Sequence, residues 1–144
     1  MSTFQLSQEM IDHLKQDKSL RIMLYCAMDP GTSTYPIDIT FPMQVEARIN
    51  QEIFTGNLRG IKKKPGTTRP ADITEYVRKS ANFANKIDLA YATSDRSGYA
   101  STNKFLYVVY LVKKQSVDAL VEKIKVGKKI AKQQVLSESE YCRY

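Results

Sequence analysis

Five short segments of the sequence have the residue pattern of β-strands. Apolar and polar side chains alternate along residues 37–41 and 45–49, and residues 20–28, 87–92 and 104–113 are rich in β-branched, aromatic and other apolar residues. Gly, Pro, Asp, Asn and Ser residues, which favour turns, separate most of these segments. Because successive side chains of a strand point to opposite faces of a sheet, this pattern predicts a mainly β fold.

Residues 20–28 are the first predicted strand. Leu20, Ile22, Leu24 and Cys26 share one face of the predicted strand, and we expect that face to point into the core. Cys26 is then a small buried hydrophobe and not a reactive thiol.

The longest apolar run covers residues 105–112 and shows no alternation. A strand that is apolar on both faces is typical of the centre of a sheet, so we expect 104–113 to be a central strand covered by another sheet or a helix. Residues 93–103 are polar and are expected to form a long hairpin loop from 87–92 into this strand.

The same run is too short to cross a membrane, because a spanning helix needs about 20 apolar residues. The first six residues lack a basic segment followed by an apolar one, so no secretory signal is visible. We therefore expect an intracellular protein in a reducing compartment, without membrane contact.

Two helices are expected beside the strands. Residues 7–18 have apolar side chains at helical spacing, with Ser7 as the N-cap and with Leu6 and Ile11 placed to form a hydrophobic staple. Ser116 caps a second helix that Gly127 ends. We expect this helix to pack on the strands through one apolar stripe, formed by Val117, Leu120, Val121 and Ile124.

A length of 144 residues suits one hydrophobic core. Residues 128–135 are expected to continue as a further helical piece, and 137–144 as a frayed end. The expected organisation is thus one domain over 1–136 and a C-terminal tail over 137–144.

The sequence offers little to a catalytic or metal site. Its soft ligands are Cys26, Cys142 and the single histidine, His13, too few for a four-ligand zinc site. His13 falls on the exposed side of the predicted first helix, and the common phosphate-binding and nucleophile motifs are missing. We expect no catalytic residue, cofactor or metal in this chain.

The main surface feature is a basic loop between residues 57 and 72. It carries five cations and no acid over eleven residues, between glycines and prolines that restrict the backbone. The net charge of +7 favours an acidic protein surface or nucleic acid as partner. A solvated basic face is an equally good interpretation of the charge alone. The five cations are Arg59, Lys62, Lys63, Lys64 and Arg69.

Residues 58–74, which include the five cations of this loop, resemble the PINIT domain of Siz/PIAS-type SUMO E3 ligases. Pro70-Ala71-Asp72-Ile73-Thr74 stands where the family has Pro-Ile-Asn-Ile-Thr, and its Ala-Asp variant resembles the fungal branch. Phe41-Pro42, residues 46–50, residues 110–113 and the helix that follows agree in order. The resemblance covers roughly residues 4–135.

The resemblance implies a β-sandwich with a short N-terminal helix and C-terminal helices packed on it. In such ligases a zinc-bearing SP-RING follows the PINIT domain and engages the SUMO-conjugating enzyme. No such RING can be assembled from this chain, so we expect the chain alone to be non-catalytic and its parent to be a SUMO E3 ligase. A nuclear location and chromatin substrates, with the DNA sliding clamp as one candidate, are implied in the same way. We expect the chain to be a monomer.

The leading hypothesis is therefore a substrate-recognition module that docks an acceptor protein. The alternative is a basic β-domain that binds nucleic acid, supported by the net charge and by the lysine-rich residues 123–132. A purely structural spacer is the third possibility. The predicted partner-binding residues are Arg59, Lys62, Lys63, Lys64, Thr67, Thr68 and Arg69.

Overall fold

The computed structural model describes residues 2–29, 31, 37–64, 66–92 and 104–127. The chain divides into two units, Met1–Lys114 and Gln115–Tyr144, and each is described by itself. The predicted loop 93–103, the helical piece 128–135 and the tail 137–144 with Cys142 lie outside the described residues.

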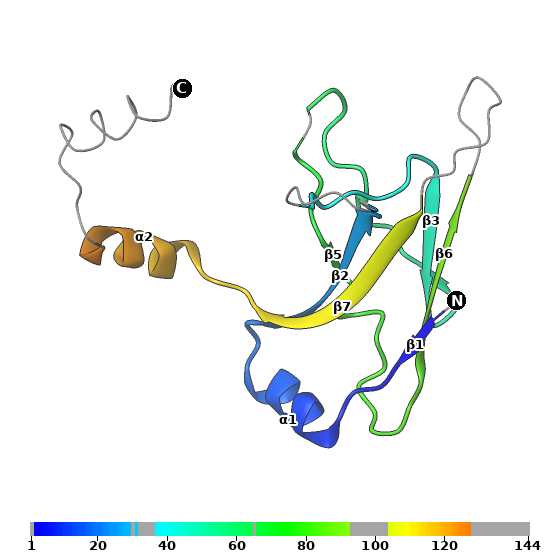
Figure 1. The fold of residues 1–144 in the computed structure, drawn as a ribbon. Coiled ribbons are helices and arrows are strands. Elements are labelled where there is room, and N and C mark those ends of the chain that lie inside the picture. Colours follow the sequence, from blue (N-terminus) through cyan, green and yellow to red (C-terminus); the bar gives the residue numbers. More distant parts are fainter. Residues whose placement is uncertain (1, 30, 32–36, 65, 93–103, 128–144) are drawn as a thin grey trace. The chain divides into compact units, whose positions relative to one another are not determined.

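The first unit is built from two antiparallel sheets (Figure 1). One sheet has the strand order β1-β6-β3-β4 and the other β5-β2-β7. This confirms the expected mainly β fold. The strands are β1 (Ser2–Phe4), β2 (Leu20–Met28), β3 (Val45–Ile49), β4 (Glu52–Ile53), β5 (Ala71–Asp72), β6 (Asn85–Tyr91) and β7 (Phe105–Lys113).

The core is formed by the facing sides of both sheets. On β2, Ile22, Leu24 and Cys26 are at most 1% exposed, as their shared face predicts, and they belong to one apolar cluster with Ile49 of β3 and Ile87 of β6. Strands β2 and β3 have the predicted bounds. Alternation along 45–49 and the apolar side chains at every second position of 20–26 identified these strands, because one face of each is buried.

Helix α1 (Gln8–Gln16) begins as predicted. The Ser7 Oγ accepts a hydrogen bond from the Met10 amide at 3.2 Å, and Leu6 and Ile11, the two staple residues, are both buried. The helix ends before Asp17, which contacts the far end of β7 through an ion pair of 3.0 Å with Lys113.

Residues 37–41 do not form the predicted strand. The Thr40 amide donates to the Cys26 carbonyl at 2.8 Å, but no ladder develops from this bond, and Pro42 has no amide hydrogen to extend it. Phe41 is nevertheless buried. The alternating pattern therefore predicted correctly that an apolar side chain of this segment is buried. Its prediction that the segment pairs with another strand was wrong.

Strand β7 is an edge strand, and the prediction of a central strand was wrong. Its described neighbour is β2, which itself occupies the centre of the three-stranded sheet. One side of β7 packs partly on the core, and the other exposes Leu106, Val108 and Tyr110. Strands β6 and β7 belong to different sheets, so the predicted hairpin between them is also wrong.

Helix α2 (Val117–Val126) forms at the predicted position in the second unit. The Ser116 Oγ accepts from the Ala119 amide at 3.1 Å, and Gly127 is the C-cap. None of the ten residues is buried, so the predicted packing of its apolar stripe on the strands is not confirmed. Neither described helix is long and apolar enough to cross a bilayer.

Candidate functional site

The basic loop leaves the core after one buried residue and returns to it at another. Leu58 is buried at its start and Ala71, the first residue of β5, at its end. All five predicted cations between these anchors are exposed. The sequence therefore predicted correctly that this segment is an exposed loop with its charges in water.

A polar turn holds the start of the loop. The Asn57 Oδ1 accepts hydrogen bonds from the amides of Arg59 (2.9 Å) and Gly60 (3.1 Å), while its Nδ2 donates to the Gly60 carbonyl (3.0 Å). Gly60 has φ +74°, and a Cβ there would lie 2.7 Å from the Thr68 backbone nitrogen. Glycine is needed because this conformation and this close approach both exclude a side chain.

Two threonines in the C-terminal half of the loop form hydrogen bonds to its N-terminal half. The Thr67 hydroxyl accepts from the Ile61 amide at 2.8 Å and donates to the Lys64 carbonyl at 2.7 Å. The Thr68 hydroxyl donates to the Arg59 carbonyl at 3.4 Å. Both side chains are also predicted partner-binding residues. Their observed contacts hold the backbone that presents the cations.

The cations of the loop have no acidic partner within the described part of the chain. The first acid after them in sequence is Asp72, and its carboxylate lies 3.4 Å from the Arg21 Nε. Lys63 stands at φ +62°, a left-handed conformation at the tip of the loop. The arrangement presents several positive charges on a backbone that is fixed by side-chain hydrogen bonds.

The 70–74 segment is a structural brace for this loop. Its residues Ala71 and Asp72 pair with β2, and the Ile73 amide donates to the Ile22 carbonyl at 2.9 Å. The Thr74 hydroxyl accepts from the Ile22 amide at 2.9 Å and donates to the Asp72 Oδ1 at 2.6 Å. The Thr74 hydroxyl thus accepts the hydrogen bond from β2 that a backbone carbonyl would accept in a longer β5. The 70–74 segment is therefore bound to β2, and this binding sets the position of the C-terminal end of the loop.

A second brace involves two asparagines whose role was not predicted from the sequence. Asn85 is fully buried, and its Oδ1 accepts from the Asn50 Nδ2 at 2.8 Å and from the Arg78 amide at 2.8 Å. Asn50 and Gln51 have φ of 52° and 74° at the β3–β4 turn, as a tight hairpin with a primed turn requires. Asn-Gln between a strand and a short apolar segment was the signal for this hairpin.

A surface that was not predicted from the sequence lies on the outer face of β2 and β7. Tyr25 and Tyr110 form an edge-to-face pair there, with ring centroids 5.7 Å apart, and Leu106 and Val108 are exposed beside them. The signal was present, because 105–112 is apolar at every position, and it was assigned to burial on both faces.

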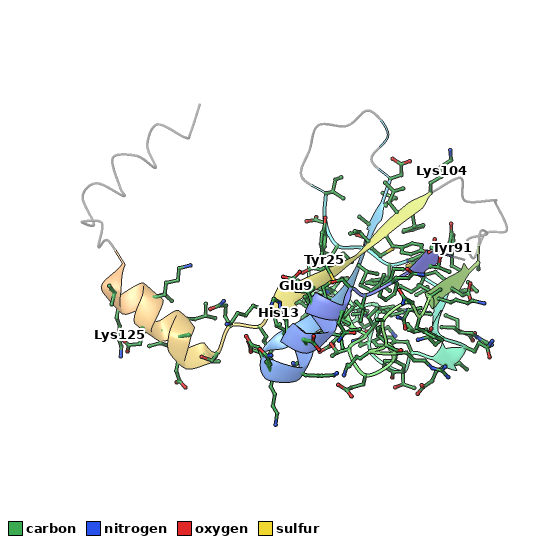
Figure 2. All side chains as sticks on the ribbon, turned by 90° about the horizontal axis from the view of Figure 1, so that it is seen from below. Glu9, His13, Tyr25, Tyr91, Lys104 and Lys125 are labelled. Carbon is green, nitrogen blue, oxygen red and sulfur yellow. The ribbon has the colours of Figure 1, made fainter. Side chains whose placement is uncertain are left out.

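No catalytic arrangement exists among the residues that the structure describes. Burial raises the pKa of the Cys26 thiol to about 11, which leaves it protonated and unreactive at neutral pH. His13 is exposed on α1 (Figure 2). No group of three or more His, Cys, Asp or Glu side chains in the described ranges is placed to hold a metal ion.

Comparisons with known proteins agree with this architecture. The crystal structure of the S. cerevisiae SUMO E3 ligase SIZ2 matches with a TM-score of 0.69 and 27% identity, over 94% of this chain and 50% of that one. That of SIZ1 matches with a TM-score of 0.68 and 30% identity, over 98% of this chain and 49% of that one.

Curated fungal sequences give the same result. The E3 SUMO-protein ligase pli1 of Schizosaccharomyces pombe is 33% identical over 125 residues, which are 85% of this chain and 16% of that protein. SIZ1 of Saccharomyces cerevisiae is 33% identical over 117 residues, 81% of this chain and 12% of that protein. The PINIT domain family matches residues 1–113, and the chain therefore belongs to the PINIT domain family found in fungal SUMO E3 ligases.

Proposed function

We propose that this chain serves a SUMO E3 ligase as the domain that docks the acceptor protein, with the basic loop as a contact surface. The observation that carries the proposal is the braced loop, whose five exposed cations have no acidic partner among the described residues, in a domain whose relatives are SUMO E3 ligases. An acidic surface on the acceptor is the complementary chemistry.

In this proposal the domain positions the acceptor protein and takes no chemical part in the transfer of SUMO. A ligase of this type accelerates transfer by holding an acceptor lysine beside the thioester of the charged conjugating enzyme. Binding of the acceptor by one module raises the effective concentration of that lysine even where the affinity of the module is weak. In this proposal the conjugating enzyme is engaged by an SP-RING, and the acceptors are nuclear proteins, with the DNA sliding clamp as a candidate.

The test uses a full-length ligase that contains this domain. We expect charge reversal at the loop tip to slow modification of an acidic acceptor, mainly through slower association, with the largest defect at low salt. The initial rate of SUMO transfer is measured across a salt series, with automodification as the internal control. The variant is Lys62→Glu, Lys63→Glu and Lys64→Glu combined.

A matched control separates the loop from net charge. Lys18, Lys86 and Lys123 are exposed lysines outside the loop, and their reversal to Glu changes the net charge by the same amount. We expect this control to retain most of the activity. Equal rates for the two triple variants at every salt concentration would contradict the proposal.

A second candidate function is nucleic-acid binding, favoured by the same unpaired cations and the net charge of +7. A protein that neutralises Z phosphates loses affinity with a slope of about −0.9Z in log salt. Binding of duplex DNA by the chain with a slope steeper than about −3, lost in the loop variant, would favour this function over acceptor docking.

A further inference from the structure

The outer edge of β7 has unpaired backbone groups. At the two ends of the β2–β7 ladder, the Asp29 amide donates to the Lys104 carbonyl (2.8 Å) and the Lys114 amide to the Ser19 carbonyl (2.9 Å). Bonding alternates along an antiparallel pair, so the even-numbered residues of β7 bond to β2. The N–H and C=O groups of Tyr107, Val109 and Leu111 therefore point away from β2, and no described strand pairs with them.

Two features that usually prevent strand addition, a bulge and a proline, are missing from this edge. The register runs without interruption from Leu20↔Lys113 to Met28↔Phe105, so β7 contains no bulge. Its nine residues include no proline, and its one charge is at the C-terminal end. Long apolar edges without such interruptions are templates for an added strand.

The edge also borders a groove between the two sheets. A cavity of about 450 Å³ is lined by residues 2–4 of β1, by Ile87 of β6 and by residues 105–109 of β7. Strand β1 is itself one of the two edge strands of its described sheet. Tyr107 and Val109 are only partly buried on this side, whereas Leu24 on β2 is 0% exposed, so the core is less completely covered here.

Charged side chains mark both ends of the edge. Lys104 and Lys114 lie on the same face as the exposed Leu106, Val108 and Tyr110, and Figure 2 labels Lys104 at one end of β7. No described carboxylate pairs with either lysine. An apolar stripe with a lysine at each end is complementary to an apolar segment with acidic ends.

We propose that β7 receives an extended segment of a partner protein as an added strand. The free backbone groups select an extended chain, because they match the N–H and C=O spacing of a strand. The groove selects apolar side chains at alternate positions of that segment, and the two lysines select acidic residues at its ends. This surface is separate from the basic loop, and the proposal does not rest on acceptor docking by that loop.

The test uses the full 144-residue chain and a fluorescent peptide. The probe has valine at every second position and acidic residues at both ends, and binding is followed by fluorescence polarisation. Two further peptides carry N-methyl groups on alternate amides, one set on the amides that face β7 and the other on the amides that face away. We expect one methylated peptide to bind like the parent peptide and the other to lose affinity at least tenfold.

Hydrogen exchange locates the added strand. We expect the peptide to slow exchange at the amides of Tyr107, Val109 and Leu111, while the amides of Leu106 and Val108, which already bond to β2, change little. Combined Lys104→Glu and Lys114→Glu substitutions should weaken binding of the peptide with acidic ends. Binding of a version of the peptide with neutral ends should not change. Absence of binding at millimolar peptide, equal affinities of the two methylated peptides, or slowed exchange elsewhere would each overturn the proposal.

Discussion

Replacement of Thr74 by valine tests whether the 70–74 motif is a structural brace. The Thr74 side chain is 6% exposed, and its hydroxyl satisfies the Ile22 amide at 2.9 Å while it donates to Asp72 at 2.6 Å. Valine has nearly the same shape, so the change removes the hydroxyl and leaves little cavity. The buried Ile22 amide is then left without an acceptor.

The structure sets the expected magnitude. An unsatisfied buried donor costs about 1–3 kcal/mol. The Asp72 carboxylate is exposed and keeps the Thr74 amide at 3.1 Å, so water replaces most of the lost bond on that side. We expect Thr74→Val to lower the free energy of unfolding by about 2 kcal/mol, which corresponds to a fall in Tm of roughly 8 °C for a domain of this size.

The assay is urea unfolding followed by circular dichroism, with two controls. Thr68→Val removes a half-buried hydroxyl with a long hydrogen bond of 3.4 Å, and we expect a loss below about 0.5 kcal/mol. Thr74→Ser keeps the hydroxyl and should recover most of the stability. An urea midpoint for Thr74→Val equal to that of Thr68→Val would refute the assigned role of the hydroxyl.

Further expectations concern the loop, the end of α1 and the core. Gly60→Ala should lower the free energy of unfolding by about 2 kcal/mol or more, because φ is +74° and the added Cβ would lie 2.7 Å from a backbone atom. Gly66→Ala has a similar φ of +73° but open space around the Cβ, so it should lower the free energy of unfolding by only about 1 kcal/mol. The urea midpoints of the two variants compare these losses. Hydrogen bonds from the side chain and then the amide of Ser19, followed by Lys113, lower the pKa of Asp17 from 3.8 to about 2. A lowered pKa stabilises the fold above about pH 4, and the effect is lost as the pH falls toward 2, so the stability difference between the parent and Asp17→Asn should shrink over that interval. Leu24→Ala, at a fully buried site, should cost about 2–5 kcal/mol, and Leu111→Ala, on the edge strand, clearly less, as thermal unfolding would show.

The sequence determined the elements that depend on short-range patterns. The caps at Ser7 and Ser116 and the bounds of β2 and β3 follow from neighbouring residues, because capping hydrogen bonds and side-chain alternation act over a few positions. The exposure of the basic loop follows in the same way, since five cations without acids cannot be buried.

The short motif at residues 70–74 was enough to predict the family from the sequence. The structural role of that motif could not be predicted in this way. Only the structure shows that the Thr74 hydroxyl reaches Ile22, a residue 52 positions earlier in the chain. It likewise shows that Thr67 and Thr68 contact the backbone of their own loop. Such contacts depend on which segments meet in space, and local patterns hold no information about that.

Strand neighbours were decided by the tertiary structure alone. An apolar run such as 105–112 is compatible with a central strand and equally with an edge strand that has an apolar outer face. The pattern of side chains indicates the surroundings of each face of a strand, but it does not indicate which strands lie beside it. The structure places β7 at an edge, separates it from β6 and leaves 37–41 without a ladder. Pairing is set by hydrogen bonds between distant segments, and the free edge of β7 became visible only once those bonds were in place.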